Sequence, residues 1–485
     1  MNKKNLILII AVVLMAVFCI FAYFVFQRLS QESILQETTQ SDYSFDADGF
    51  LWGTEAYLTM LESPNGQKEI DAISNTLKVK NIKFRVDWAY GKNLSNIVCI
   101  GPNCLKKYDL DKFAQIFKQN SWSMRPMFSL QPTEAIASVM TDSDIDDYVD
   151  YIDWFIARYK KDANIKYIEL INNPVFLFIN NKTTLAQLIE IQNKVYDRVK
   201  NKYPDIMVGT HGFEYNFDGE TTDPLVSSDS EIQMVDYFLD KNNGAKFDYW
   251  AFHGYAIYPP VQTAVRNKYA GVAGVLEIRK KMDANGWQDR QIIDTEHVPS
   301  SGPALSNKQD KFDAALAVQE LVVKRTLKYN GKYVLAGVTP LKIIHREAGG
   351  EMEWGSLKAD SSLSRTMKAT SLLWSKLKKY NYSSRVSGEF DNFDKIWMEK
   401  FQSGDDKELY VFFKPFPKQE AVFVPENKSL MASLDVPPAS YTLNLKQKPA
   451  SIVLTDINGN TTAIIPSQTI TLKAVNSPKF LEVEY

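Results

Sequence analysis

Short apolar runs and amphipathic segments alternate along residues 48–380 of the sequence. The runs are short enough to be buried strands. Between them, stretches such as 144–160 and 184–203 repeat apolar residues at spacings of three and four, which predicts helices that bury one face. The eight apolar runs are FLWGTEAYL, IKFRVDW, SMRPMFSL, IKYIELI, DIMVGTHG, FDYWAFHGY, RQIIDTEH and YVLAGVTPLKII. Eight strands alternating with helices predict an α/β fold of the (β/α)8 TIM-barrel type.

An open doubly wound sheet is the alternative architecture, but it usually carries a glycine-rich phosphate turn after its first strand. The first run here continues as WGTEAYL and has no such turn. From about residue 390 the pattern changes to short strands separated by Pro, Gly, Asn and Asp. This second pattern predicts a small antiparallel β-sandwich at the C-terminus.

The N-terminus carries an uncharged apolar run from Leu6 to Phe26, preceded by Lys3 and Lys4. At about 1.5 Å per residue, such a run can cross a hydrocarbon core of roughly 30 Å. The residues at the C-terminal end of this run form a poor cleavage site, which favours an uncleaved signal anchor over a signal peptide. The flanking lysines predict a single-pass membrane protein with its N-terminus inside and its bulk extracytoplasmic. The expected divisions are 1–28 (tip and span), 29–47 (stalk), 48–385 (barrel) and 386–485 (sandwich).

The composition of the chain excludes some classes of partner but does not identify one. The 485 residues carry a formal net charge of -2, which argues against nucleic acid as the main partner. An aromatic content of 12% suits either a large core or a groove that stacks flat ligands. The four histidines are scattered and no metal motif is visible, so neither a metal nor a cofactor is expected. The sequence does not indicate the oligomeric state.

Two of the three cysteines, Cys99 and Cys104, lie in the loop-like segment CIGPNC. On the oxidising side of a membrane they could close a small disulfide ring. Two unpaired loop thiols are the alternative.

Polar residues follow several of the predicted strands, at the end where the loops of a barrel carry its site. Taken singly, each has an ordinary explanation, such as a salt bridge, a core histidine or a solvated carboxylate. Together they would form a ring of polar groups that faces one mouth of the barrel. They are Arg85 and Trp88 at the end of the second run, Asn172 and Asn173 directly after the fourth, His253 and Tyr255 at the end of the sixth, and Glu296 at the end of the seventh.

These motifs, in this order, resemble those of clan A glycoside hydrolases, which are retaining glycosidases built on (β/α)8 barrels. Residues 48–485 look most like the family 39-type enzymes, including membrane-associated exopolysaccharide glycosidases that end in a β-sandwich. The segments FRVDW, FHGY and IIDTEH match the family's second, sixth and seventh strand ends, and INNP matches the fourth imperfectly. The segment WGSLKADSSLSRTMKATSLLW is similar to the family's stretch after the eighth strand.

The resemblance implies a carbohydrate substrate or ligand and a role for each matched residue. Glu296 would be the nucleophile, Tyr255 would donate a hydrogen bond to it, and Arg85 would hold it ionised. Asn172 would contact the sugar 2-hydroxyl, and His253 would line the same site. Trp88 and Trp354 are candidates for stacking on sugar faces, with rim or core packing as the alternative.

The chain departs from the family where the acid/base glutamate should stand, because Asn173 occupies that position. A retaining glycosidase needs one carboxyl group to attack and another to protonate the leaving oxygen. An amide has no acidic proton of its own with which to replace that acid, and general acid–base assistance is worth about 10²–10⁴ in rate. Three outcomes follow from this departure. Glu214 could have taken over as acid, although a solvated loop residue is its ordinary reading; the substrate could need no acid; or the protein could be a pseudo-glycosidase that binds carbohydrate.

Overall fold

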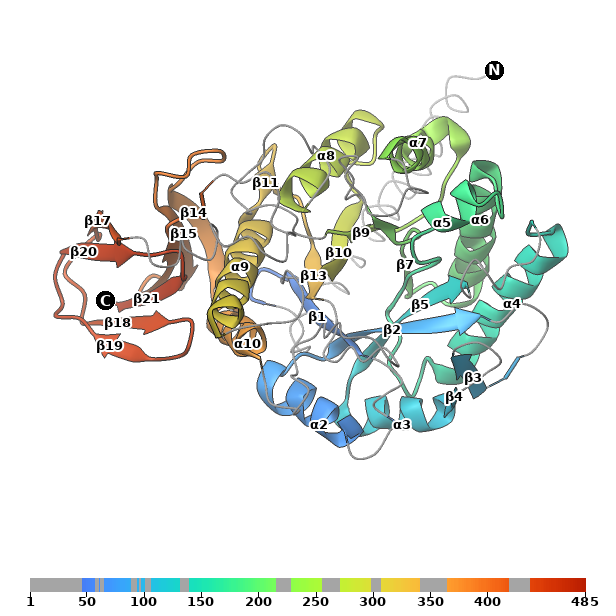
Figure 1. Ribbon diagram of the computed structural model, residues 1–485, viewed down its shortest axis with the longest axis horizontal. Coiled ribbons are helices and arrows are strands. Elements are labelled where there is room, and N and C mark those ends of the chain that lie inside the picture. The colour runs from blue at the N-terminus through green and yellow to red at the C-terminus, as the bar shows by residue number, and fades with distance from the viewer. Residues whose placement is uncertain are drawn as a thin grey trace, which may run out of the picture.

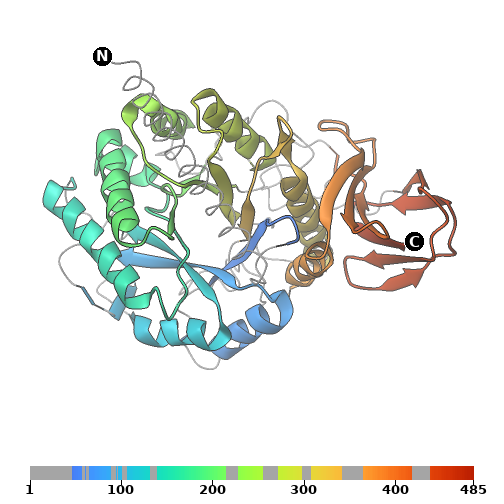
Figure 2. The ribbon, with the colours of Figure 1, turned by 180° about the vertical axis from the view of Figure 1, so that it is seen from behind.

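The computed structural model describes residues 46–56, 61, 65–88, 94–95, 97–100, 106–130, 139–214, 228–254, 271–297, 307–340, 364–417 and 437–485. Strands and surrounding helices make up one region, and antiparallel sheets from the C-terminal part of the chain lie at one end of it (Figure 1). The view from behind shows the same arrangement, with the helices α9 (Asn307–Thr326) and α10 (Arg365–Leu377) beside the C-terminal sheets (Figure 2).

A parallel sheet forms the centre of the first region. Its strand order is β5-β2-β1-β13-β10-β9-β8, and β1 pairs with both β2 and β13. The two edges are joined through the paired strands β6 and β7, by bridges Met127–Glu169 and Gly209–Tyr249. The predicted α/β class and TIM-barrel-like sheet are therefore confirmed. The strands are β1 (Leu51–Ala56), β2 (Asn81–Trp88), β5 (Ser123–Leu130), β6 (Tyr167–Ile168), β7 (Met207–Val208), β8 (Phe213–Glu214), β9 (Tyr249–His253), β10 (Gln291–His297) and β13 (Gly337–Pro340).

Helices cover the outside of this sheet; most of them bury one face, whereas α9 is buried on all sides from Phe312 to Thr326. Thr141 and Thr184 begin α4 and α6 with reciprocal capping boxes, which satisfy backbone N–H groups of the first turn. The helices are α2 (Asn65–Asp71, continued by a π-helical turn Ala72–Leu77), α3 (Leu110–Asn120), α4 (Asp142–Tyr159), α5 (Val175–Ile179), α6 (Leu185–Lys202), α7 (Ser228–Leu239), α8 (Gly271–Ala284), α9 (Asn307–Thr326) and α10 (Arg365–Leu377).

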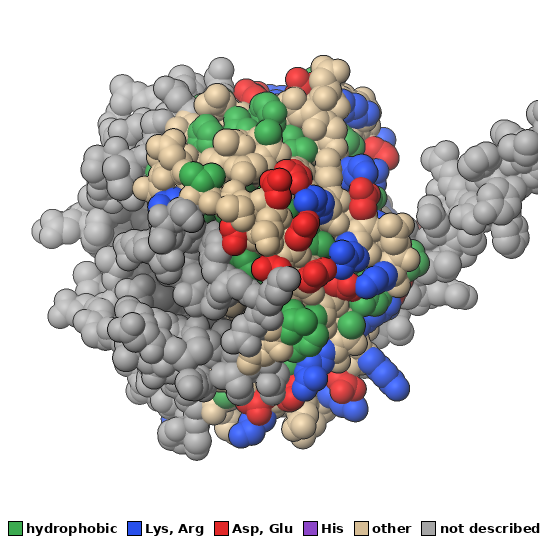
Figure 3. Space-filling model, turned by 90° about the vertical axis from the view of Figure 1, so that its right-hand side faces the viewer, with side chains coloured by type: hydrophobic (Ala, Val, Ile, Leu, Met, Phe, Trp, Pro, Cys, Tyr) green, Lys and Arg blue, Asp and Glu red, His purple; other side chains and the backbone are tan. Residues whose placement is uncertain are grey.

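The outer face of α4 and α6 is polar and carries both signs of charge. Lys194 lies 2.9 Å from Asp146, and Arg198 lies 2.9 Å from Asp150, each pair linking the two helices. Figure 3 shows Lys and Arg side chains next to Asp and Glu side chains on the side of the molecule that carries these helices. Such mixed surface pairs are typical of a solvated face and contribute little stability individually.

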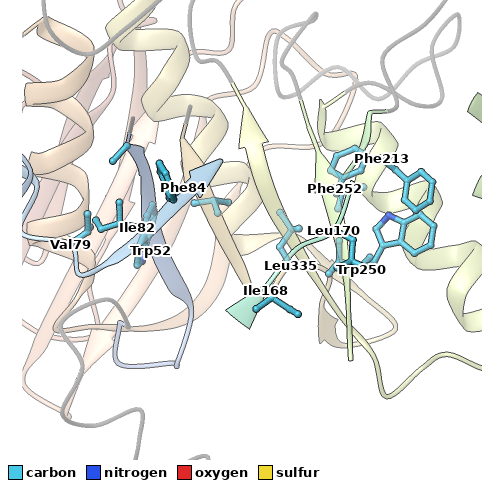
Figure 4. Packing of buried hydrophobic residues seen from close by; sticks show 14 of the residues in the cluster. Trp52, Val79, Ile82, Phe84, Ile168, Leu170, Phe213, Trp250, Phe252 and Leu335 are labelled. Carbon is cyan, nitrogen blue, oxygen red and sulfur yellow. The ribbon is translucent and has the colours of Figure 1, made fainter. Parts of the chain in front are cut away.

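The two faces of the barrel strands carry different side chains. On β2, Phe84 packs against Phe113 of α3 with ring centroids 4.2 Å apart, whereas Lys83 points to the barrel interior. Figure 4 shows further apolar side chains on the helix side, including Trp250, which stacks on Phe213. The interior itself begins with a small apolar layer that consists of Leu51, Tyr249, Ala251 and Ile293. Charged side chains follow this layer toward the carboxyl ends of the strands.

The C-terminal region contains a six-stranded antiparallel sheet and a two-stranded one, with an apolar cluster between them. The predicted antiparallel strands are confirmed within the described residues, and residues 418–436 of the predicted sandwich lie outside them. Strand β14 was not predicted, because its sequence NYSSRVS lacks apolar alternation. The strands are β14 (Asn381–Ser387), β15 (Trp397–Ser403), β16 (Lys407–Phe413), β17 (Ala439–Asn444), β18 (Ser451–Asp456), β19 (Thr461–Ala463), β20 (Thr469–Ala474) and β21 (Lys479–Glu484).

Buried hydrogen bonds connect the two regions through α9. Thr326 Oγ1 donates to Glu399 Oε1 of β15 at 3.1 Å, and Gln319 Nε2 donates to the carbonyl oxygen of Asn476 at 2.5 Å. Because Gln319 and Glu399 are fully buried, these contacts are part of the core and not of a surface.

Several sequence-based expectations fall outside the described residues. No helix among the described residues is long and apolar enough to cross a membrane, and the run Leu6–Phe26 is not among them. Cys99 lies in β3 (Ile97–Ile100), which pairs with β4 (Lys106–Asp109). Cys104, Tyr255 and Trp354 are not described. The disulfide, the hydrogen bond from Tyr255 to Glu296 and the stacking of Trp354 on a sugar therefore stay predictions.

Candidate active site

Glu296 reaches the barrel interior because β10 carries an irregularity just before it. Asp294 pairs with Phe252 of β9, but the next pair is Glu296 with His253, so Thr295 is an extra residue. In a regular strand, residues 294 and 296 would share one face. The bulge breaks this alternation. Asp294 therefore turns toward α9, while Glu296 joins the face of His253.

Asp294 anchors the ends of β9 and β10 from outside the barrel. Its Oδ1 accepts a hydrogen bond from the backbone N–H of Gly254 at 3.1 Å, and its Oδ2 lies 2.6 Å from Lys324 Nζ. Lys324 also pairs with Glu320 and donates to the carbonyl oxygen of Gly254. Burial, partly offset by Lys324, raises the pKa of Glu320 to about 7. This cluster fixes the strand ends from which Glu296 and His253 project.

A buried lysine is in direct contact with the Glu296 carboxylate. Lys83 Nζ lies 3.1 Å from Glu296 Oε2 and 3.6 Å from Glu169 Oε1. Burial alone would lower the pKa of Lys83, but Glu169 and Glu296 outweigh burial and raise it above its usual value. Lys83 is therefore an ammonium ion that compensates both carboxylates. The predicted role of Arg85 at Glu296 stays a prediction, and its Nε donates to Asp87 at 2.7 Å.

His253 connects the surviving carboxylate with the amide that replaces the second one. Its Nε2 lies 3.1 Å from Glu169 Oε1, and its Nδ1 lies 3.0 Å from Asn173 Oδ1. The same Nδ1 is 3.7 Å from Glu296 Oε2. Asn173 and Glu296, which are far apart in the sequence, therefore contact one imidazole ring.

The charge of this imidazole follows from its neighbours. Burial lowers the pKa of His253 and Lys83 acts in the same direction, but the carboxylates of Glu296 and Glu169 together outweigh both, so that the pKa is raised above its usual value. Burial likewise disfavours the charged form of Glu169, yet Lys83 and the His253 hydrogen bond hold its pKa below the usual value. An imidazolium donates from both ring nitrogens, which fits acceptor oxygens on both sides of His253.

Counting the charges supports the same assignment. Among the buried side chains of the described barrel interior are the cations Lys83 and Arg125 and the carboxylates Glu55, Glu169 and Glu296. With His253 as an imidazolium, the positive and negative charges of this group are equal in number. Buried charges are retained in proteins mainly when they are paired in this way.

The segment Asn172-Asn173-Pro174 ends the fourth strand and begins α5. Asn173 has φ 45, in the left-handed region, which asparagine tolerates better than most residues. Its backbone N–H donates to the carbonyl oxygen of Gly212, and its own carbonyl oxygen accepts from Phe176. The turn therefore places the Asn173 side chain beside His253. Asn172 Oδ1 is buried and has no hydrogen-bond partner among the described residues, as an acceptor for a ligand hydroxyl would be.

Gly212 allows the imidazole and Glu169 to approach each other. A Cβ atom at this position would lie 2.4 Å from His253 Nε2 and 2.7 Å from Glu169 Oε1. Both distances are shorter than van der Waals contact, and the facing atoms belong to buried, hydrogen-bonded groups. Glycine is therefore required here for the hydrogen bond between His253 and Glu169.

The remaining predicted residues are placed as follows. The backbone of Glu214 lies opposite His253 in the pairing of β8 with β9, and its side chain is outside the described part of the chain. Trp88 is only 2% exposed and packs edge-on against Tyr148 of α4. The prediction that Trp88 stacks on a sugar is therefore replaced by the core-packing alternative, because the ring lies on the helix side of β2.

Sequence reasoning missed Lys83 and Glu169, although both left a signal. Each is a charged residue in the middle of an apolar strand, in IKFRVDW and IELI. Lys and Glu are almost never fully buried unless they are paired. Charged residues at such positions therefore predict partners within the barrel.

His211 lies outside this cluster and makes the fold sensitive to acid. Burial, only partly offset by the Leu188 carbonyl, lowers the pKa of His211 to about 4. Between pH 6.5 and 4 the unfolded state thus binds a proton that the folded state refuses, so this stability is present above pH 6.5 and lost as the pH falls. At pH 5 the loss is about 2 kcal/mol.

We expect His211→Gln, which cannot take up that proton, to lose less stability between pH 7.5 and pH 5 than the wild type. Urea unfolding at the two pH values measures this difference. An equal loss in both proteins would contradict the assignment of the acid sensitivity to His211.

No protein-family model and no curated protein matches the sequence. Solved structures do match. A family 39 glycoside hydrolase from Bacteroides cellulosilyticus aligns with a TM-score of 0.61 at 15% identity, over 89% of this chain and 80% of that one. A monomeric beta-xylosidase from Caulobacter crescentus aligns with a TM-score of 0.55 at 14% identity, over 91% and 96%. A family 44 xyloglucanase from Paenibacillus polymyxa aligns with a TM-score of 0.53 at 11% identity, over 90% and 96%. The protein therefore has the fold of family 39 glycoside hydrolases.

Proposed function

We propose that the protein is a glycoside hydrolase-like protein that acts on a polysaccharide or glycoconjugate by a retaining-type mechanism, with Glu296 as the nucleophile. The observation that carries this proposal is the meeting of Glu296 and Asn173 at the His253 ring, at the carboxyl ends of the barrel strands. This end carries the active sites of TIM-barrel enzymes. The fold shared with family 39 enzymes supports the same proposal.

Glu296 has the surroundings that a carboxylate nucleophile needs. Lys83 at 3.1 Å favours its ionised form, and an ionised carboxylate can attack the anomeric carbon of a sugar. The Oδ1 of Asn172, which has no hydrogen-bond partner in the described part of the chain, is suited to accept a hydrogen bond from the neighbouring sugar hydroxyl. Attack by Glu296 would form a covalent glycosyl ester, which water then hydrolyses.

Asn173 favours a second candidate, a pseudo-glycosidase that binds carbohydrate without cleaving it. The two carboxyl groups of a retaining glycosidase are normally about 5 Å apart across the scissile bond. In this protein the second carboxyl group is replaced by the Asn173 amide, which has no acidic proton of its own at neutral pH. The first candidate therefore predicts turnover that depends strongly on the leaving group, and the second predicts binding alone.

The location of the protein is part of the proposal. The apolar run Leu6–Phe26 behind two lysines supports a membrane anchor with the barrel on the extracytoplasmic side. A polysaccharide or glycoconjugate of the cell envelope would be within reach there.

We expect the wild type to hydrolyse aryl glycosides with good leaving groups, such as dinitrophenyl glycosides, and Glu296→Ala to lose this activity. Azide should raise wild-type turnover and give a glycosyl azide of retained configuration, because azide attacks the glycosyl ester without a general base. Glu190→Ala, which removes a surface glutamate paired with Lys194 at 2.9 Å, is the matched control and should keep wild-type activity. If the wild type and Glu296→Ala are equally inert but both bind glycan, the pseudo-glycosidase is the correct candidate.

A further inference from the structure

Three side chains form a continuous hydrogen-bonded path that ends at the position of the missing acid. Glu169 Oε1 lies 3.1 Å from His253 Nε2, and His253 Nδ1 lies 3.0 Å from Asn173 Oδ1. Glu169 and His253 are fully buried, whereas Asn173 is only half-buried, at the end of its strand. The path therefore leads from the buried interior toward the mouth of the barrel.

We propose that His253 supplies the proton of the missing acid through the Asn173 amide. As Glu296 attacks, the proton on His253 Nδ1 passes to Asn173 Oδ1, and a proton on Asn173 Nδ2 passes to the leaving oxygen. This proposal rests on the proposed function of Glu296. Within it, His253 acts through Asn173, and Glu169 acts through His253, so both are positioning residues.

The proton transfers balance in both halves of the reaction. In the first half, the bond between Glu296 and the anomeric carbon forms, the glycosidic bond breaks, and Asn173 becomes its imidic acid tautomer beside a neutral His253. In the second half, a water attacks the ester and gives a proton to Asn173 Nδ2. The proton on Asn173 Oδ1 then returns to His253 Nδ1, and the carboxylate of Glu296 is released. No oxidant, reductant or further reactant is needed.

The orientation of the Asn173 amide is the geometric requirement for this transfer. Oδ1, the acceptor atom of the amide, is the atom that faces His253. Nδ2 is the atom of this side chain that carries hydrogens and so could give one to an oxygen. His253 is fully buried, so its ring does not reach a leaving group at the mouth of the barrel by itself. An intermediate side chain is therefore necessary for any proton that starts on the imidazole.

The charges around His253 couple proton release to the chemical step. Glu296 and Glu169 face the ring as anions, while Lys83 and the Lys324-paired Asp294 are the other charged groups near it. The Glu296 carboxylate is the largest influence that favours the imidazolium. When Glu296 becomes a neutral ester, that influence disappears, and the ring gives up its proton more readily. The proton is thus released in the same step in which the glycosidic bond breaks and the leaving oxygen becomes negatively charged.

Because an imidic acid is less stable than an amide, the transfer should be slower than protonation by a carboxylic acid. The relay therefore predicts weak activity on poor leaving groups. It does not predict its absence.

The charge of His253 provides a direct test. The full chain contains four histidines, so 15N-histidine labelling gives a simple spectrum from the protein in detergent. We expect one buried histidine to keep both ring nitrogens protonated at pH 7, and to titrate at lower pH in Glu169→Gln. Glu320→Gln is the matched control, because Glu320 is an equally buried glutamate that pairs with Lys324 and has no hydrogen bond to His253. A neutral His253 at pH 7 overturns the relay even if Glu296 is a working nucleophile.

Kinetics provide the second readout. Glu169→Gln should lower kcat/KM for glycosides with poor leaving groups by about 10- to 100-fold, within the range that general acid catalysis supplies. The loss should be smaller on dinitrophenyl glycosides, which need little acid assistance, and the alkaline limb of the pH profile should move to lower pH. Equal losses on both substrates indicate a structural role for Glu169 and overturn the relay. A wild type inert toward dinitrophenyl glycosides overturns the proposed function of Glu296, and the relay with it.

Discussion

Replacing Lys83 with methionine should lower the free energy of unfolding by about 3–5 kcal/mol, the usual cost of breaking a buried ion pair on one side. Lys83 is fully buried and contacts the carboxylates of Glu169 and Glu296. Without the ammonium group, both carboxylates would stay in the interior with less compensation, or one would take up a proton. Methionine has nearly the length of lysine, so the expected loss comes from the charge and not from a cavity.

Urea unfolding, followed by tryptophan fluorescence, measures this loss. Lys194→Met is the control, because Lys194 makes a surface pair with Asp146 at 2.9 Å, and such pairs contribute about 1 kcal/mol or less. The double variant Lys83→Met/Glu169→Gln should regain part of the loss, since it removes one of the two uncompensated carboxylates. A Lys83→Met protein as stable as Lys194→Met would show that the interior does not hold the charges inferred here.

Replacing Asn173 with glutamate should raise turnover of glycosides with poor leaving groups by about 10²–10⁴, because it supplies the second carboxyl group of a retaining site. Dinitrophenyl glycosides, which need little acid assistance in the first step, should gain far less from it. Asn173 has φ 45, and a glutamate in this left-handed conformation costs about 1–2 kcal/mol. The variant should therefore be slightly less stable than the wild type while being more active.

Asn173→Asp separates the chemistry of this gain from its geometry. Aspartate tolerates the left-handed conformation as asparagine does, but its carboxyl group is one methylene shorter than that of glutamate. It should restore less activity than Asn173→Glu. Steady-state rates over a series of leaving groups compare the two variants. If neither variant gains activity while Glu296→Ala abolishes it, the leaving oxygen does not lie near residue 173.

The positions of the strand ends could be predicted from the sequence, because apolar runs and helical spacings recur in strict alternation. That alternation also identified His253, Asn173 and Glu296 as residues of one mouth. The bulge at Thr295 could not be predicted. Whether a strand contains an extra residue depends on its hydrogen-bonded neighbours, and the segment IIDTEH alone gives no sign of it.

The buried partners of these residues could not be predicted from the sequence either. The sequence predicted Arg85 as the cation at Glu296, but Lys83 makes this contact. The two residues are two positions apart on β2, so they lie on the same face at different depths of the barrel. Which depth meets Glu296 depends on the stagger of strands that are distant in the sequence. The choice between sugar stacking and core packing for Trp88 could not be made from the sequence for a related reason. It follows Asp87 directly, so it falls on the opposite face of β2, toward α4.

Gly212 offers a way to recognise the same arrangement in other sequences. Any side chain there would force apart the imidazole and the interior glutamate, so a barrel with alanine or serine at this point cannot hold them as this one does. A glutamate inside the fourth strand, an asparagine four residues later and a glycine after the fifth strand would form a readable signature. Genomes could then be searched for proteins that share this substitute for a carboxylic acid, separately from those that merely lost theirs.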